Sequence, residues 1–156
     1  MSRNKLKNFK ERVESWDAEE SGNYERWNTY KSSTIAFSPS AILNGFVDVH
    51  FAGFRATWHT NFVSKQYLDN TESAERSLPC YSQTDINASY TFNFSKRALG
   101  LKQIVLGADF NNIFDRHYAA SGYVYYDWYY AGKRNSTVAY IPMAGFTCMG
   151  HITLKF

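Results

Sequence analysis

Few residues in this sequence have the types and spacing that catalysis or metal binding requires. There are four histidines, at His50, His59, His117 and His151. None of them has a partner at the spacing of a metal site. Asp85 and Asp109 fall on neighbouring predicted strands and can be considered as a general acid–base pair, but hydrogen bonds to their neighbours are the simpler role. We therefore expect no enzyme activity, no metal and no cofactor.

A group of aromatic residues offers a different chemistry, the stacking of rings on a ligand. These residues lie in the stretch 114–143, which we expect to be a long loop, and they are Tyr123, Tyr125, Tyr126, Trp128, Tyr129 and Tyr130. On a loop, such rings can stack on a sugar, a porphyrin or a siderophore. They can equally pack on one another and stiffen the loop. Both interpretations remain open from the sequence.

The composition limits the class of protein. The chain has 156 residues, of which 44% are hydrophobic and 18% aromatic, and its formal net charge is +3. A charge this small, with basic residues scattered along the chain, argues against a nucleic-acid partner. The mean hydropathy is −0.46, and no run approaches the roughly 18 apolar residues of a transmembrane helix. Membrane β-strands are compatible with these values, because alternating strands average to a polar score.

Alternation of apolar and polar residues with a period of two predicts β-strands along most of the chain. We expect six strands, at residues 3–15, 34–51, 55–67, 84–94, 103–111 and 145–156. Long loops are expected at 16–33, 68–79 and 114–143, and short turns at 52–54 and 95–100. The predicted fold class is all-β, an antiparallel up-and-down meander of about six strands.

The lengths of the connections favour a membrane barrel over other β folds. Long and short connections alternate, as they do in outer-membrane barrels with short periplasmic turns and long outer loops. Aromatic residues gather near both strand ends, like the two aromatic girdles of such barrels. They include Phe51, Phe94 and Phe156 at one end and Tyr67 and Tyr118 at the other. We therefore expect the meander to be part of a transmembrane β-barrel.

The last strand carries the clearest alternation. Apolar or small residues occupy every second position back from the C-terminus: Phe156, Leu154, Ile152, Gly150, Cys148 and Phe146. Mostly polar residues lie between them, so one face is apolar and the other is polar. The same apolar face should carry residues of the two preceding strands: Ile86, Ala88, Tyr90, Phe92, Ile104, Leu106 and Phe110. A slip of one residue would move a whole set to the other face.

The fifth predicted strand ends on a motif that suits a structural role. The motif contains Asn111, Asn112, Phe114 and Asp115. Asn and Asp side chains at such positions turn the chain by hydrogen bonding to nearby backbone groups. We expect this motif to fix the loop rather than to bind a ligand.

Cys80 lies at the outer end of the fourth predicted strand and Cys148 lies on the sixth, with the fifth strand between them. Alternate strands lie about 9.6 Å apart. That separation exceeds the roughly 7 Å limit between the Cα atoms of a disulfide. We expect both to be free thiols.

Five short motifs occur in a fixed order through nearly the whole chain. They are IAFSP at 35–39, VSKQYLDNT at 63–71, DINASYTF at 85–92, NNIFDRHY at 111–118 and YIPMAG at 140–145. Together they resemble the C-terminal β-barrel segment of TonB-dependent outer-membrane receptors of Bacteroidetes type. The last strand resembles the signal that the barrel-assembly machinery reads, which would be carried by Phe146, Ile152, Leu154 and Phe156.

The resemblance implies a localisation in the bacterial outer membrane and uptake of a scarce nutrient, such as an iron-siderophore, haem, cobalamin or a glycan. The implied partners are outer-membrane lipid, the remainder of the receptor barrel and plug, and the barrel-assembly machinery. The TonB complex would act only through the plug. A plug domain and a TonB box are absent from residues 1–156, so we expect the C-terminal part of such a receptor.

Two alternatives remain open from the sequence. One is a soluble, aromatic-rich β-sandwich that binds carbohydrate, and the other is a small complete outer-membrane barrel with further strands. If either barrel interpretation is correct, the purified chain should aggregate in buffer without detergent, because large exposed apolar faces aggregate in water. The sandwich would be a soluble monomer.

Overall fold

The computed structural model describes residues 3–17, 24–98 and 100–156, and these residues form an all-β structure. The chain divides into two compact units. The first unit contains Met1–Ile42, Val63–Tyr81 and Tyr118–Met143, and the second contains Leu43–Phe62, Ser82–His117 and Ala144–Phe156. Within the described residues, no helix has the length and apolar character needed to cross a membrane.

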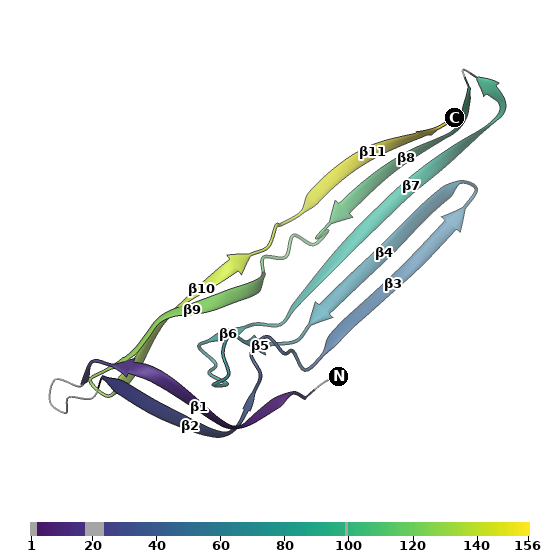
Figure 1. Ribbon diagram of the computed structural model, residues 1–156. Helices are drawn as coiled ribbons and strands as arrows, with labels where there is room; N and C mark the ends of the chain where they lie inside the picture. The colour runs from purple at the N-terminus through teal and green to yellow at the C-terminus, as the bar shows by residue number, and fades with distance from the viewer. Residues whose placement is uncertain (1–2, 18–23, 99) are drawn as a thin grey trace. The chain divides into compact units, whose positions relative to one another are not determined.

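Five strands form one sheet in the second unit (Figure 1). Their order across the sheet is β11 (Thr147–Lys155), β8 (Leu101–Asn111), β7 (Tyr81–Ala98), β4 (Phe54–Val63) and β3 (Ile42–Phe51). This order follows the chain, so the antiparallel meander predicted from the sequence is confirmed for these five strands. β8 lies between β7 and β11, which confirms the predicted separation of the strand that follows Cys80 from the strand that carries Cys148.

The register of this sheet confirms the predicted apolar face. Ile104, Leu106 and Phe110 on β8 lie opposite Leu154, Ile152 and Cys148 on β11, and opposite Phe92, Tyr90 and Ile86 on β7. Directly opposed residues of antiparallel strands have neighbouring Cβ atoms on the same face. These nine side chains therefore share one face, and no strand among the three has slipped.

Several predicted boundaries are wrong. The predicted strand at 34–51 begins only at Ile42, because residues 35–41 contain a turn in which Phe37 has a φ of 53°. The predicted strand at 55–67 ends at Val63, and residues 66–67 instead form β5 (Gln66–Tyr67), which pairs with β6 (Ser77–Leu78). The predicted turn at 95–100 is shorter, because β7 continues to Ala98 and β8 begins at Leu101.

A second sheet, of four strands, lies in the first unit and was not predicted. Its order is β10 (Lys133–Pro142), β9 (Ala119–Tyr130), β1 (Lys5–Ser15) and β2 (Glu25–Thr34). The predicted loop at 114–143 is therefore wrong, since it contains the β9–β10 hairpin. The predicted loop at 16–33 is wrong from Glu25 onward, where β2 begins, and its residues 18–23 lie outside the described residues. The first predicted strand is β1, but it pairs with β2 and, in parallel over a short stretch, with β9, not with the meander.

The sequence of the β9–β10 hairpin explains why it is not a loop. Tyr, Val and Trp, which are enriched in strands, make up much of β9. Ala131 and Gly132 then connect the strands with φ values of 50° and 70°. Positive φ at both central residues is typical of the type I′ turn, whose twist matches that of the paired strands. The hairpin therefore forms from local preferences that agree with one another.

The two units differ in where their apolar side chains lie. Among the described residues, the buried hydrophobic side chains are Val13, Val63, Leu68 and Leu78, and all four belong to the first unit. In the second unit, large apolar side chains are exposed on the sheet, and Ile152 retains 68% of its accessible surface. Cys80 and Cys148 are both exposed and unpaired.

Candidate functional site

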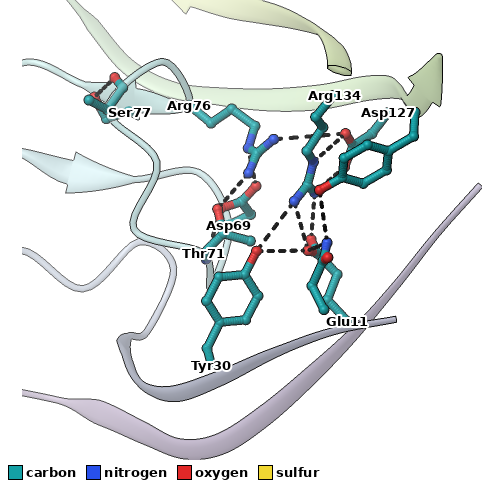
Figure 2. Close-up of polar contacts among 11 residues, drawn as sticks. Glu11, Tyr30, Asp69, Thr71, Arg76, Ser77, Asp127 and Arg134 are labelled. Atoms are coloured by element: carbon teal, nitrogen blue, oxygen red, sulfur yellow. Dashed lines mark hydrogen bonds and ion pairs between the residues drawn. The ribbon is translucent and has the colours of Figure 1, made fainter. Parts of the chain in front are cut away.

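A cluster of ion pairs joins the four strands β1, β2, β9 and β10 (Figure 2). At its centre, Arg134 of β10 donates through Nη2 to Oε1 of Glu11 at 2.7 Å and through Nη1 to Oε2 at 2.8 Å. Two parallel bonds between a guanidinium and a carboxylate are strong and directional. Arg134 Nε also donates to Oδ1 of Asp127 at 2.8 Å, and Nη2 bonds to the other oxygen of that carboxylate. One guanidinium thus bridges carboxylates on β1 and β9.

Tyr30 of β2 completes this cluster on the side of Glu11. Its hydroxyl donates to Oε2 of Glu11 at 3.2 Å and accepts a bond from Nη1 of Arg134 at 3.4 Å. Burial, and then the nearby negative charge of Glu11, raise the pKa of Tyr30 above its ordinary value. The phenol is therefore held in its neutral form, in which it can donate and accept at once.

A second guanidinium connects the cluster to the segment between β5 and β6. Nε of Arg76 lies 2.6 Å from Oδ2 of Asp69, although its N–H does not point at that oxygen, so the contact is an ion pair without a hydrogen bond. Nη2 of Arg76 donates to the hydroxyl of Thr71 at 2.6 Å, and Nη1 lies 3.8 Å from Asp127. Asp127 therefore lies between two arginines.

The cluster is better suited to holding strands together than to moving protons. Arg134 retains 14% of its side-chain surface and Glu11 retains 15%. Burial acts to lower the pKa of Arg134, but bonds to Asp127 and Glu11 outweigh it, and the pKa is raised above its ordinary value. The guanidinium therefore stays charged at any pH at which the protein folds. Removing one partner of such a buried pair leaves an uncompensated charge, so the elements are strongly coupled.

A β-bulge on β9 places Asp127 in this cluster. The β9–β10 pairing shifts register between Asn135 and Thr137, and Tyr126 in this region has a φ of 53°. A bulge inserts an extra residue into one strand and redirects the side chains around it. Asp127 is turned toward Arg134, and the Tyr126 ring remains 73% exposed. The bulge therefore both brings Asp127 to Arg134 and leaves the Tyr126 ring exposed to solvent.

The structure divides the six predicted ligand-binding aromatic residues into different environments. Tyr123, Tyr125 and Tyr126 are exposed and form a row of adjacent rings, with centroids 5.7 and 5.1 Å apart. Tyr130 is exposed near the hairpin turn. Two residues on β9 have packing partners instead: Trp128 lies against Trp16 at 6.0 Å, and Tyr129 lies under Arg26 at 4.2 Å. Stacking of rings on one another and exposure of rings to solvent therefore occur on the same hairpin.

The motif at 111–115 makes the hydrogen bonds to backbone that its residue types suggested. Asn112 is buried, its side-chain amide donates to the carbonyls of Arg116 and Ala144, and its side-chain oxygen accepts from the Arg116 N–H. Asp115 accepts from the Phe146 N–H at 2.9 Å. Phe114 is exposed, and its ring meets Trp58 edge-on. The motif ties the end of β8 to the start of β11.

The polar face of the second unit's sheet carries two of the four histidines, His59 and His151, and both aspartates considered for catalysis. Nδ1 of His59 lies 3.8 Å from Asp85, and Nδ1 of His151 lies 3.3 Å from Asp109. The structure therefore gives each aspartate its own histidine neighbour and does not assemble the two into one site. Opposite His151 on β8 is Gly107, whose missing side chain leaves room for the imidazole. No group of three potential metal ligands occurs among the described residues.

Sequence reasoning missed the ion-pair cluster entirely. Glu11 and Arg134 are 123 positions apart, and no local motif links them. The one available signal was Asp127, a carboxylate in the middle of a strand made almost wholly of aromatic and small residues. A charge at such a position requires a partner once the strand is packed.

Comparison with known proteins finds no matching family model, no matching curated protein and no matching solved structure. A functional conclusion must therefore be argued from the chain's own residues and their geometry.

Proposed function

We propose that this chain forms part of the β-barrel wall of a TonB-dependent outer-membrane receptor, which takes up a scarce nutrient. In this proposal the five-stranded sheet spans the membrane, and the first unit belongs to the extracellular part. The ordered motifs between residues 35 and 145 suggested this family from the sequence. The structure adds an observation of a different kind, which concerns the faces of the sheet.

The observation that carries the proposal is the exposed apolar face of β7, β8 and β11. Its residues are held in register on one side, and many are about half exposed, including Leu154, Leu106 and Phe92. In water such a face would be a strong aggregation site, since exposed apolar patches of this extent are rare on monomers. In a bilayer it would be solvated by lipid, as the outward band of a membrane barrel is.

The opposite face supports the same proposal. Between the apolar residues, the strands carry paired polar side chains, such as Asn87 with Asp109 at 2.5 Å and Gln103 with Asn93 at 2.9 Å. Alternation of lipid-facing apolar residues with polar residues facing the lumen is the signature of a transmembrane barrel strand. A strand with both faces in lipid could not carry these groups.

The lengths of the connections between the strands of the five-stranded sheet also support the proposal of a barrel wall. The β3–β4 and β7–β8 connections are short and lie at one end of the sheet. The segments that join β4 to β7 and β8 to β11 are long and contain the β5–β6 pair and the β9–β10 hairpin, and the β1–β2 hairpin precedes β3. Short turns at the periplasmic end and long extracellular segments are usual in outer-membrane barrels.

The β-sandwich alternative has less support. A sandwich buries the apolar faces of two sheets against each other. Among the described residues of the second unit, no hydrophobic side chain is buried, so nothing in that unit covers the apolar face. We therefore retain the barrel wall as the proposal and use solubility as a first test. Purification of a monodisperse monomer without detergent would contradict it.

A sharper test uses two adjacent residues of β11. Cys148 lies on the apolar face, and Met149 lies opposite Asp109 on the polar face. One variant keeps Cys148 and carries Cys80→Ser, and the other carries Cys80→Ser, Cys148→Ser and Met149→Cys. Each is spin-labelled and placed in lipid vesicles. The label at 148 should collide more with oxygen, and the label at 149 more with a water-soluble nickel chelate. Equal access of the chelate to both labels would refute a lipid-facing sheet.

A further inference from the structure

A hollow of about 220 Å³ lies on the polar face of the five-stranded sheet, at the middle of β7 and β11. Its polar lining comes from four strands of the second unit: Arg55, Thr57, Asn87, Ser89, Asp109 and His151. We propose that this hollow binds a primary ammonium group. The proposal goes beyond the receptor function and does not rest on it, because every contact that it uses lies within this one sheet.

A glycine on β8 allows His151 of β11 to lean toward the hollow. Gly107 lies between His151 and Ser89 in the register of the three strands. A Cβ atom at position 107 would lie 2.2 Å from both Cε1 and Nε2 of His151, so the imidazole occupies the space that a side chain on β8 would fill. Nδ1 of the same ring lies 3.3 Å from Oδ2 of Asp109. In the neutral imidazole the proton on Nδ1 faces this carboxylate, and Nε2 remains as a hydrogen-bond acceptor.

The carboxylate of Asp109 orients a second acceptor. Its Oδ1 accepts a hydrogen bond from Nδ2 of Asn87 at 2.5 Å, and the two residues lie directly opposite each other on β8 and β7. Because the amide of Asn87 uses its N–H group in this bond, its carbonyl oxygen is left to accept a bond from a ligand. Asp109 retains 27% of its side-chain surface, so the carboxylate itself is accessible as well. Asp109, Asn87 and His151 thus provide three acceptors around one hollow.

The charges around the hollow favour a cation. Arg55 donates through Nε and Nη2 to the two carboxylate oxygens of Asp48, at 3.1 and 2.8 Å, and Thr57 donates to the same carboxylate at 3.1 Å. The charge of Arg55 is therefore balanced by Asp48. Asp109, in contrast, has an amide and an imidazole as its partners, which leave its charge uncompensated while the imidazole is neutral. An anion would meet this carboxylate as a like charge, which lowers affinity, whereas a cation is attracted.

A primary ammonium group matches the hollow in both charge and hydrogen bonding. It is a compact cation with three N–H donors that rotate about a single bond. The hollow offers one uncompensated negative charge and three acceptors to receive them. A metal ion is a poorer match, because no group of three potential metal ligands occurs among the described residues. A quaternary ammonium ion has the charge but no N–H donor, so it should bind less tightly.

The test is NMR of the full chain in detergent micelles with isotope-labelled histidine. Methylammonium represents a free amine, and N-acetyl-lysine amide represents a lysine side chain of another polypeptide. At least one of these probes should shift the Nε2 resonance of His151, which is assigned by its loss in His151→Gln. The resonances of His117, which does not line the hollow, should not change. The probe that binds more tightly identifies the source of the ammonium group.

Two aspartate variants form a matched pair. Asp109→Asn keeps the shape of the hollow and removes its charge, so affinity should fall by at least about tenfold, as expected when a hydrogen bond to a charged group is lost. Asp85→Asn is the control. Asp85 also lies beside a histidine on the polar face, with Nδ1 of His59 at 3.8 Å, but it does not line the hollow. Affinity in this variant should be unchanged.

Three results would overturn the proposal. The first is that neither probe shifts the resonance of His151. The second is that tetramethylammonium or sodium shifts it as strongly as methylammonium does, and this comparison needs only the unchanged protein. The third is that Asp109→Asn, with its β-structure confirmed by circular dichroism, binds the probes as tightly as the unchanged protein. None of these results alters the outcome of the spin-label test, so the site and the barrel wall can fail separately.

Discussion

Replacing Arg134 by Met should make the first unit's four-stranded sheet open far more readily than the removal of an exposed charge does. The change keeps the length and much of the volume of the side chain but deletes the guanidinium that bridges Glu11 and Asp127. Both carboxylates remain largely buried, retaining 15% and 24% of their side-chain surface. Two negative charges would then face each other without their common partner.

The size of this effect follows from the burial of the pair. Breaking a buried pair by removing one partner costs about 3–5 kcal/mol. We expect the lower end, about 3 kcal/mol, because Arg76 still lies 3.8 Å from Asp127 and compensates part of its charge. A cost of about 3 kcal/mol corresponds to a change of about a hundredfold in the opening equilibrium.

Hydrogen exchange measured by mass spectrometry is the suitable assay, because it reports local opening without requiring the whole chain to unfold. Peptides that cover β1, β9 and β10 should exchange about a hundredfold faster in the Arg134→Met protein, and peptides of β8 and β11 should not change. Arg134→Lys should give an intermediate effect, since an ammonium cannot make the forked contact with both carboxylates.

Arg12→Met is the matched control. Arg12 also pairs with a glutamate across β1 and β2, at 2.7 Å, but the two side chains retain 63% and 45% of their surface. Exposed pairs are worth about 0–1 kcal/mol, so exchange should rise by less than about fivefold. The reasoning fails if Arg134→Met and Arg12→Met accelerate exchange equally, or if Arg134→Met changes exchange by less than threefold.

Three further predictions test other parts of the chain. Because the pKa of Tyr30 is raised in the folded state, the folded protein keeps this proton to a higher pH than the unfolded chain does. The free energy of unfolding measured with urea should therefore decline as the pH rises above about 10. Tyr30→Phe should remove the part of this decline that comes from Tyr30. Asn112→Ala should cost about 2–4 kcal/mol in the same assay, and Asn112→Gly less, because glycine accepts the φ of 51°. In outer-membrane fractions of cells, Phe156→Ala should reduce assembled protein more than Leu154→Ala; equal losses would leave Phe156 without a special role.

The sequence predicted the second unit's sheet because its strands are regular. In β7, β8 and β11, apolar and polar residues alternate over nine or more positions, and alternation of that length indicates a β-strand with one apolar face. β2 has no such signal, since Glu25–Thr34 is almost wholly polar and contains two aromatic residues as its only large apolar groups. It is a strand because β1 provides a ladder for it. Pairing of that kind depends on the partner and cannot be inferred from β2 alone.

The prediction failed for the β9–β10 hairpin for the opposite reason. Its aromatic content is a strand signal, but the prediction assigns the whole stretch 114–143 to one aromatic-rich loop. The bulge at Tyr126 also breaks the alternation that would have identified β9. The ion-pair cluster depends on that bulge, because it turns Asp127 toward Arg134. An irregularity in one strand thus hid both the strand and the cluster.

The two units differ in whether they have a buried apolar core, and this contrast is a physical reason to propose separate roles for them. In the first unit a small group of described hydrophobic residues, which includes Leu78 and Val13, is buried, although rings such as that of Tyr126 are exposed. A buried apolar core of this kind is usual for a structure in water. In the second unit no described hydrophobic side chain is buried, most apolar side chains of β7, β8 and β11 share one open face, and polar groups such as Asn87 and Asp109 bond to each other on the opposite face. Under the proposed function, lipid would cover the open apolar face of the second unit's sheet, and the first unit would keep its own small core.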